Sequence, residues 1–262
     1  MIEGAGPIDL RAGNDRAILL LHGFGDTPQT LAYLARDLHA NGYDVRVPLL
    51  PGHGRSIDVM DTTSHTEWID TARAELIALR ARHAWVALGG ISMGGAIAAI
   101  LAAEMRDLPS LVIIAPSLRM PARLRFLARA APLWSDWRGP VRSTTSRSIL
   151  DPAERALNLA YGVVTGRSLL QLSRIESAAR RALRSVSAPT LFIQSKSDHR
   201  LPVGAARRAF ERLGAKTKRL VLTDEGGHII TVDYGRERVF EEVRAWLRLV
   251  PEPRPSQGAR TD

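Results

Sequence analysis

Residues 85–105 read WVALGGISMGGAIAAILAAEM, and this stretch decides how the surrounding chain folds. The apolar run at residues 85–88 predicts a buried β-strand, and the apolar residues that follow as far as Met105 predict a helix. Between them stands Gly90-Ile91-Ser92-Met93-Gly94, a G-x-S-x-G motif whose glycines let strand and helix approach closely. A turn this sharp predicts that the Ser92 hydroxyl points out of the sheet. Taken alone, the five residues also fit an ordinary glycine-rich turn.

On both sides of this stretch, short apolar runs alternate with helical patterns. The predicted strands are 17–21, 44–47, 111–114, 190–194 and 217–223, and the predicted helices are 27–40, 66–82, 203–213 and 236–249. Strands and helices that alternate at this spacing form a mostly parallel sheet with helices on both faces. The fold class is therefore predicted to be α/β.

The alternation stops at residues 118–185, where we find no clean strand and only short helical fragments between prolines and glycines. We interpret this segment as a helical lid inserted between two strands of a core formed by residues 1–117 and 186–250. Residues 251–262 are rich in Pro, Ser, Gly and Arg, and we expect them to be disordered.

The composition is that of one globular domain: 262 residues, 45% hydrophobic and 24% charged. The absence of cysteine excludes disulfides, thiol catalysis and cysteine-based zinc sites, and it fits a reducing cytoplasm. The first fourteen residues lack a basic segment followed by an apolar run, so no signal peptide is expected. The longest apolar stretch, 96–103, is too short to span a bilayer. We therefore expect a cytoplasmic protein.

The net charge of +9 is carried by arginine and is concentrated in the predicted lid. Thirteen arginines and four acids lie within residues 118–185, so the rest of the chain is neutral. A biased genome composition would spread the excess of arginine evenly along the chain. Arginines whose aliphatic stems cover apolar surface could instead be concentrated in one segment. The alternative is a surface that contacts anionic lipid headgroups. Nucleic acid is not an expected partner, because aromatic residues make up only 5% and no binding motif occurs.

A serine hydroxyl is a weak nucleophile that needs a base. His228 follows the last predicted strand in the sequence Glu225-Gly226-Gly227-His228, and the carboxyl ends of parallel strands are where sites form. We predict that His228 is the base. Of the other histidines, two are expected to shape loops (His22, His53) and three to be solvated (His39, His65, His83).

A histidine base needs a carboxylate that fixes which ring nitrogen carries the proton. Asp198 follows the strand at 190–194 and gives the order Ser, Asp, His that this kind of fold uses. Its rival, Asp224, lies only four residues before His228 and is expected to do no more than cap the turn. No acid stands at Pro116-Ser117, the other position sometimes used. Asp198 is therefore the predicted acid.

Acyl transfer also creates an oxyanion that backbone N–H groups must bind. Two donors are predicted: Met93, directly after Ser92, and Phe24, in the Gly-bounded turn at residues 22–25. Alternatively, that turn only reverses the direction of the chain and binds no oxyanion.

Five motifs together resemble bacterial carboxylesterases and monoacylglycerol lipases of the α/β-hydrolase superfamily. They are LHGF at 21–24, LPGHG at 50–54, GISMGG at 90–95, Ser197-Asp198 and GHIITVD at 227–233. The resemblance implies an α/β-hydrolase fold and hydrolysis of short- to medium-chain acyl esters, including monoacylglycerols. It further implies an acyl-serine intermediate without cofactor or metal, with Ser92, Asp198 and His228 as the triad and Phe24 and Met93 as oxyanion donors.

Other activities on the same scaffold stay open, because the lid sequence resembles nothing that would fix the pocket. A thioesterase or a C–C bond hydrolase would use the same three residues. A haloalkane dehalogenase would need an acid where Ser92 stands. A ligand-binding protein without activity is the remaining alternative, and such proteins commonly lack one member of the triad.

Overall fold

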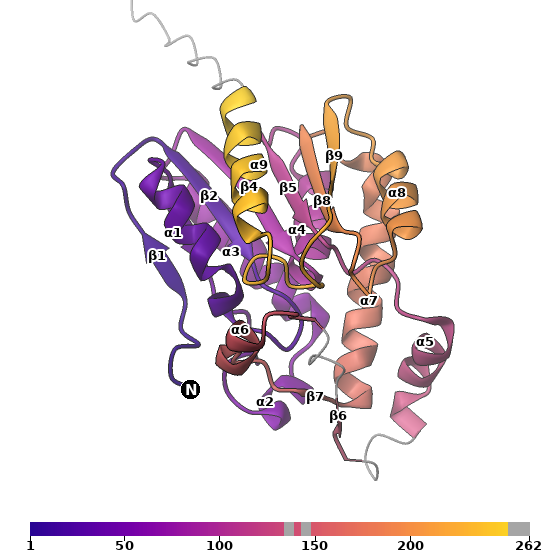
Figure 1. Cartoon of the computed structure of the whole chain (residues 1–262). Coiled ribbons are helices and arrows are strands. Elements are labelled where there is room, and N and C mark those ends of the chain that lie inside the picture. The colour runs from indigo at the N-terminus through magenta and orange to yellow at the C-terminus, as the bar shows by residue number, and fades with distance from the viewer. Residues whose placement is uncertain (134–138, 143–147, 251–262) are drawn as a thin grey trace, which may run out of the picture.

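The sheet of the computed structural model has seven strands among the residues that the structure describes, 1–133, 139–142 and 148–250. Their order is β1-β3-β2-β4-β5-β8-β9 (Figure 1). β1 (Ile8–Leu10) lies at the edge and runs antiparallel to β3, and the other neighbouring pairs are parallel. These are β2 (Arg16–Leu21), β3 (Asp44–Val47), β4 (Trp85–Ile91), β5 (Leu111–Ile114), β8 (Thr190–Ser195) and β9 (Lys218–Thr223). The predicted α/β class is confirmed.

Helices cover both faces of the sheet (Figure 1). The apolar residues of α1 (Ala32–Ala40) and α9 (Arg236–Leu249) belong to one buried cluster, and those of α3 (His65–Arg80), α4 (Met93–Glu104) and α8 (Val203–Arg212) belong to the other. The strands supply both clusters: in β2, Ile18 and Leu20 belong to the first, while Leu19 and Leu21 belong to the second. This alternation follows from the two-residue period of a strand that is buried on both faces.

The predicted boundaries agree with the structure within a few residues, and β3, β5 and α9 have the predicted bounds. The predicted helix 27–40 begins as a 3-10 turn, η1 (Pro28–Leu31), before α1. Two short elements were not predicted: β1, with three residues, and α2 (Ile57–Asp61), with five. Neither is long enough to show a period in the sequence.

Between β5 and β8 the chain leaves the sheet. This segment contains α5 (Ala122–Arg129), η2 (Ala131–Leu133), β6 (Val141–Arg142), α6 (Pro152–Leu157), β7 (Val163–Val164), α7 (Gly166–Ala182) and η4 (Leu183–Ser185). The expectation of short helical fragments without a strand is wrong in two respects. β6 and β7 pair in an antiparallel ribbon, and α7 is 17 residues long.

The length of α7 follows from its beginning and its packing. Thr165 caps the first turn, because its side chain accepts a hydrogen bond from the N–H of Ser168 at 3.0 Å. The buried residues Leu172, Ile175 and Ala179 recur at helical spacing and join the same cluster as α4. Residues 251–262, which we expected to be disordered, lie outside the described residues. None of the described helices is long and apolar enough to cross a membrane.

The turn between β4 and α4 has the sharp geometry that the G-x-S-x-G motif predicts. Ser92 has φ 54° and ψ −118°, a conformation that residues with a side chain rarely adopt. A Cβ added to Gly94 would lie 2.0 Å from the carbonyl oxygen of Leu21, and one added to Gly90 would lie 2.4 Å from the carbonyl carbon of Gly94. Both glycines are therefore required by close backbone contacts between the helix and the ends of β2 and β4.

We predict that Gly94→Ala destabilises the protein by about 3 kcal/mol or more, because the added methyl group meets backbone atoms that cannot move aside. Gly204→Ala is the matched control within α8, where the nearest atom to an added Cβ is the end of the Arg208 side chain at 3.5 Å. That control should be neutral or should gain about 0.5–1 kcal/mol. Urea unfolding of the two variants and the parent measures both effects. Equal stability of the two variants would contradict the account of the turn.

Candidate active site

The structure brings Ser92, Asp198 and His228 together at the carboxyl end of the sheet. Ser92 stands between β4 and α4, Asp198 follows β8, and His228 follows β9. The Nε2 atom of His228 lies 2.8 Å from Ser92 Oγ, and its Nδ1 atom lies 2.8 Å from Asp198 Oδ2. All three side chains are buried. The predicted nucleophile, base and acid therefore form one chain of hydrogen bonds.

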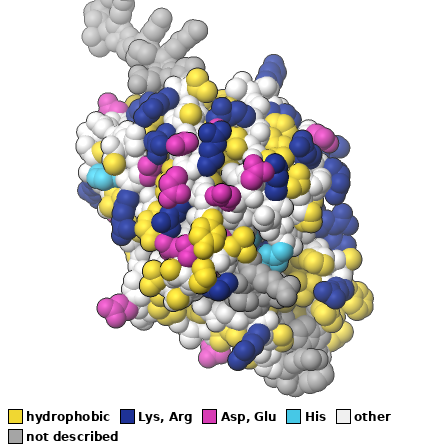
Figure 2. All heavy atoms as spheres, viewed as in Figure 1, with side chains coloured by type: hydrophobic (Ala, Val, Ile, Leu, Met, Phe, Trp, Pro, Cys, Tyr) yellow, Lys and Arg dark blue, Asp and Glu magenta, His cyan; other side chains and the backbone are white. Residues whose placement is uncertain are grey.

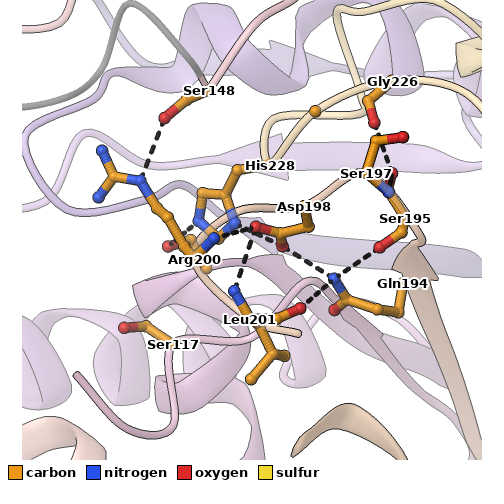
Figure 3. Close-up of polar contacts among 12 residues, drawn as sticks. Ser117, Ser148, Gln194, Ser195, Ser197, Asp198, Arg200, Leu201, Gly226 and His228 are labelled. Atoms are coloured by element: carbon orange, nitrogen blue, oxygen red, sulfur yellow. Dashed lines mark hydrogen bonds and ion pairs between the residues drawn. The ribbon is translucent and has the colours of Figure 1, made fainter. Parts of the chain in front are cut away.

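The surroundings of Asp198 favour its ionised form (Figure 3). Its Oδ1 atom accepts hydrogen bonds from the N–H groups of Arg200 at 2.7 Å and Leu201 at 3.2 Å, and its Oδ2 atom accepts one from Gln194 at 2.8 Å. Burial alone would raise the pKa of Asp198, but the charge of His228 and these hydrogen bonds lower it to about 2.

An ionised Asp198 fixes the tautomer of His228. Because the carboxylate accepts from Nδ1–H, the neutral imidazole carries its proton on Nδ1 and leaves a lone pair on Nε2. That lone pair faces the Ser92 hydroxyl, which is then the donor of the 2.8 Å hydrogen bond. The arrangement is one in which His228 can take the hydroxyl proton while Asp198 stabilises the resulting imidazolium.

Asp224, the rival acid, is not part of this chain. Its side chain is 79% exposed and forms an ion pair with Lys196. It stands at the end of β9, where its carboxylate contacts the loop after β8 rather than His228.

His22 and His53 shape loops, as expected. The Nε2 atom of His22 accepts a hydrogen bond from the N–H of Leu50 at 3.0 Å, and its Nδ1 atom lies 2.9 Å from the carbonyl oxygen of Gly23. Burial and the neighbouring His53 lower the pKa of His22 to about 3, so its ring is neutral at physiological pH. This neutral ring ties the turn after β2 to the loop after β3.

The expectation that His65 and His83 are solvated is wrong. His83 is bound between the carbonyl oxygen of Leu79 at 3.0 Å and the Asp44 carboxylate at 2.9 Å, at the opposite end of β3 from the site. His65 lies 2.9 Å from the side-chain oxygen of Gln171 in α7. Asp44 and Gln171 are distant in sequence from the histidines they bind, so no local pattern could reveal these contacts.

The predicted oxyanion donors lie on the two segments that flank Ser92. Met93 is the first residue of α4, so its N–H has no acceptor within the helix. The turn that contains Phe24 is adjacent, because a Cβ added to Gly23 would lie 3.4 Å from the Ser92 Cβ. Two backbone N–H groups beside a serine hydroxyl are what a developing oxyanion requires.

A cavity of about 790 Å³ opens onto Ser92 and His228. Much of its wall comes from residues 118–172, which supply the apolar side chains Leu118, Met120, Leu124, Leu127, Leu169 and Leu172. Polar and charged side chains also line the cavity, among them Asp26, Ser148 and Arg200. The cavity therefore has room for a small organic molecule with an apolar part and a polar part.

Sequence reasoning missed Asp233, which holds the His228 loop in place. Its buried carboxylate accepts hydrogen bonds from the N–H groups of Gly227 at 2.7 Å, Leu150 at 2.7 Å and Asp151 at 2.9 Å. It thereby joins the loop after β9 to the segment that precedes α6. The GHIITVD motif contained this residue, but only the folded chain shows what it binds.

Glu176 of α7 was also missed. It accepts hydrogen bonds from the Ser117 hydroxyl at 2.8 Å and the Met120 N–H at 2.9 Å, and burial raises its pKa. These bonds attach the start of the segment after β5 to α7. Within the described residues, no group of three or more His, Cys, Asp or Glu side chains is placed to hold a metal ion.

Known proteins with similar sequences and structures include lipases and esterases. The chain is 28% identical over 243 residues to a thermostable monoacylglycerol lipase of Bacillus sp. (strain H-257), covering 92% of this chain and 93% of that protein. It is 22% identical over 238 residues to a carboxylesterase of Bacillus subtilis (strain 168), covering 90% and 93%.

A solved structure from work on LipS and LipT, two metagenome-derived lipolytic enzymes, superimposes with a TM-score of 0.88 at 28% identity, covering 95% of this chain and 99% of that one. The fold is also that of a monoacylglycerol lipase from Paleococcus ferrophilus, with a TM-score of 0.78 at 19% identity, covering 92% and 97%. The model of the Hydrolase_4 family, described as serine aminopeptidase, S33, matches residues 12–234. The chain belongs to this family of α/β-hydrolases.

Proposed function

We propose that the protein is a serine esterase that hydrolyses short- to medium-chain acyl esters, including monoacylglycerols, in the cytoplasm. The observation that carries the proposal is the hydrogen-bonded chain Ser92, His228, Asp198 at a cavity with apolar walls. The likeness to a monoacylglycerol lipase and a carboxylesterase over most of the chain supports the choice of ester substrates.

In the proposed reaction His228 Nε2 takes the proton of Ser92 as Oγ attacks the ester carbonyl carbon. The N–H groups of Phe24 and Met93 bind the oxyanion of the tetrahedral intermediate. His228 then gives the proton to the leaving alcohol oxygen, which leaves an acyl-serine. A water molecule, deprotonated by the same nitrogen, attacks the acyl group and releases the acid, and the proton returns to Ser92.

A series of p-nitrophenyl esters of graded chain length tests the proposal. Each methylene buried in the cavity contributes about 0.8 kcal/mol, which is about fourfold in kcat/KM per methylene, until the cavity is full. We expect an optimum at short to medium chains and a fall for long ones. Highest activity on long-chain triglyceride emulsions, or on an acyl-CoA thioester, would contradict the assignment.

Ser92→Ala is the control for this series. It should abolish turnover and labelling by a fluorophosphonate while the thermal unfolding of the protein stays cooperative. If the variant turns over at the parent rate, Ser92 is not the nucleophile. Labelling of the parent at Ser92 would also exclude a ligand-binding protein without activity.

The acid is tested by Asp198→Asn beside Asp224→Asn. In the first variant the new amide would donate where the carboxylate accepts, and the charge that stabilises the imidazolium would be lost, so turnover should fall by roughly 10⁴. The second variant removes only an exposed ion pair, worth about 0–1 kcal/mol to stability, and should keep nearly full turnover. Steady-state rates at one alkaline pH on one ester compare the two, and the reverse ranking would make Asp224 the acid.

We also propose that residues 118–185 act as a lid whose basic surface contacts anionic lipid. The exposed face of α5 places Phe126, 73% exposed, beside the exposed Arg123 and Arg129. Neither arginine forms an ion pair with a described residue. Figure 2 shows hydrophobic and basic side chains close together on this side of the molecule.

The neighbouring Leu127 also lines the cavity, so a lipid surface at α5 would lie next to the acyl pocket. Arg138 and Arg147, two of the thirteen arginines of the predicted lid, lie outside the described residues.

Vesicle binding tests the lid surface. Each basic residue near an anionic membrane contributes roughly 1 kcal/mol, and salt screens this attraction. We expect binding to phosphatidylglycerol vesicles at low salt, weaker binding at high salt, and little binding to phosphatidylcholine. Arg123→Gln with Arg129→Gln should reduce it several-fold, whereas Arg207→Gln with Arg208→Gln on α8 removes the same charge outside the lid and should not. If the two double variants bind equally well, the lid arginines form a solvated surface that has no role in lipid binding.

A further inference from the structure

The backbone of Ser92 is bound to the chain that follows β5. Its N–H donates to the carbonyl oxygen of Ile114 at 3.0 Å. Its carbonyl oxygen accepts from the N–H of Ser117 at 2.9 Å, in addition to the helical bond from Ala96 at 3.1 Å. These two backbone groups flank the nucleophilic side chain. The segment 114–117 therefore holds the two peptide units that decide where the Ser92 hydroxyl lies.

This segment is itself strained. Within the described part of the chain, Ser92 and Ala115 are the only residues other than glycine with a positive φ, and φ is 41° at Ala115. Such a conformation persists only where the surroundings enforce it. On one side, the N–H of Ala115 donates to the carbonyl oxygen of Ile193 in β8 at 2.9 Å. On the other side, the segment is held at Ser117 by a residue of α7.

That residue is Glu176. Its side chain is buried and accepts hydrogen bonds from the Ser117 hydroxyl at 2.8 Å and the Met120 N–H at 2.9 Å. Arg180, one turn further along α7, donates to the carbonyl oxygen of Leu118. Hydrogen bonds to a carboxylate are stronger than those between neutral groups. The turn after β5 is therefore fixed to α7, and through Ser117 it is also fixed to the nucleophile.

We propose that Glu176 is a positioning residue for the nucleophile. Glu176 fixes Ser117, the N–H of Ser117 fixes the carbonyl group of Ser92, and the hydroxyl is thereby kept 2.8 Å from His228 Nε2. The inference rests on the proposed serine-hydrolase function. It gives the segment between β5 and β8 a part in the chemistry besides lining the cavity.

Ser117→Ala tests this link, because it removes the hydroxyl that Glu176 binds and keeps the N–H that binds Ser92. A shift of about 1 Å can lower a rate by about a hundredfold, so a partial loss of the constraint should lower kcat by about tenfold and leave KM within about twofold. Ser117→Thr keeps a hydroxyl and should restore the parent kcat. Ser173→Ala, which removes a buried hydroxyl bound to the Leu170 carbonyl oxygen, is the matched control in α7 and should also keep it.

The length of the acyl chain separates positioning from a change in the cavity wall, since Ser117 and Glu176 both line the cavity. Displacement of Ser92 affects every ester, so p-nitrophenyl acetate and p-nitrophenyl octanoate should lose kcat/KM by the same factor. The rate of labelling by diisopropyl fluorophosphate, which has no acyl chain, should fall by that factor too. A loss confined to the octanoate would mean that the two residues only shape the wall, and it overturns the proposal.

Glu176→Ala, alone and combined with Ser117→Ala, shows whether the two residues act through one contact. The second substitution should add no further loss, because the hydroxyl has already lost its acceptor. Glu154→Ala is the matched control: it removes another buried acid of the same segment, which binds Tyr33 and Arg236 and does not line the cavity. This control should keep the parent kcat. Losses that multiply, or an equal loss in Glu154→Ala, overturn the proposal.

If Glu176→Ala does not fold, the comparison of Ser117→Ala with Ser117→Thr decides, because these changes are small. Equal rates of the two variants refute the positioning. Labelling also separates this inference from the esterase assignment. If the parent is labelled at Ser92 but hydrolyses no ester, the proposed substrates are wrong, and the labelling rates of the Ser117 variants still test the positioning. If esters are hydrolysed and Ser117→Ala is labelled at the parent rate, only the positioning is refuted.

Discussion

The backbone conformation of Ser92, with φ at 54°, is the constraint on which the rest of the site depends. A residue with a side chain in this region costs of order 1–3 kcal/mol and persists only where its surroundings enforce it. Here β4 is paired with a strand on each side, and α4 is buried over most of its length. Gly94 lets the helix touch the end of β2, so the chain must turn sharply between the two elements. The turn places the Ser92 hydroxyl at the edge of the sheet where the loops that carry Asp198 and His228 begin.

Three buried aspartates around this turn show how surroundings divide the roles of one chemical group. Asp198 accepts several N–H donors and faces His228, which keeps it ionised. Asp233 binds backbone N–H groups and holds loops together. Asp26 has an oxygen without a donor among the described residues, and burial raises its pKa to about 6. The first suits catalysis, the second suits structure, and the third takes no part in the proposed reaction.

One cavity is lined by residues from two parts of the molecule, the segment between β5 and β8 and the loops at the edge of the sheet. The segment supplies leucines and a methionine together with charged and polar residues such as Arg119, Ser148 and Glu176, and the loops at the sheet edge supply Asp26, Arg200 and His228. Asp233 attaches the two parts to each other, because it accepts hydrogen bonds from the N–H groups of Leu150 in the segment and Gly227 after β9. Glu176 joins α7 to the start of the segment. An ester likewise combines an apolar acyl chain with a polar ester group. The cavity therefore offers both kinds of contact to the proposed substrate.

The sequence by itself determined the elements and the motif residues, because both are written in local patterns. Alternating strands and helices indicated the α/β class, and the positions of Ser92, Asp198 and His228 after three strands predicted that they would meet at one edge. Only the tertiary structure decided the rest. The length of α7 depends on its packing against α4, and the contacts of Asp233, Glu176 and His83 join residues that are mostly far apart in the chain. Arg200, whose charge limits the rise in the pKa of Asp26, lies 174 positions away in the sequence. Such contacts leave no local period, because burial and hydrogen bonding depend on which segments the fold brings together.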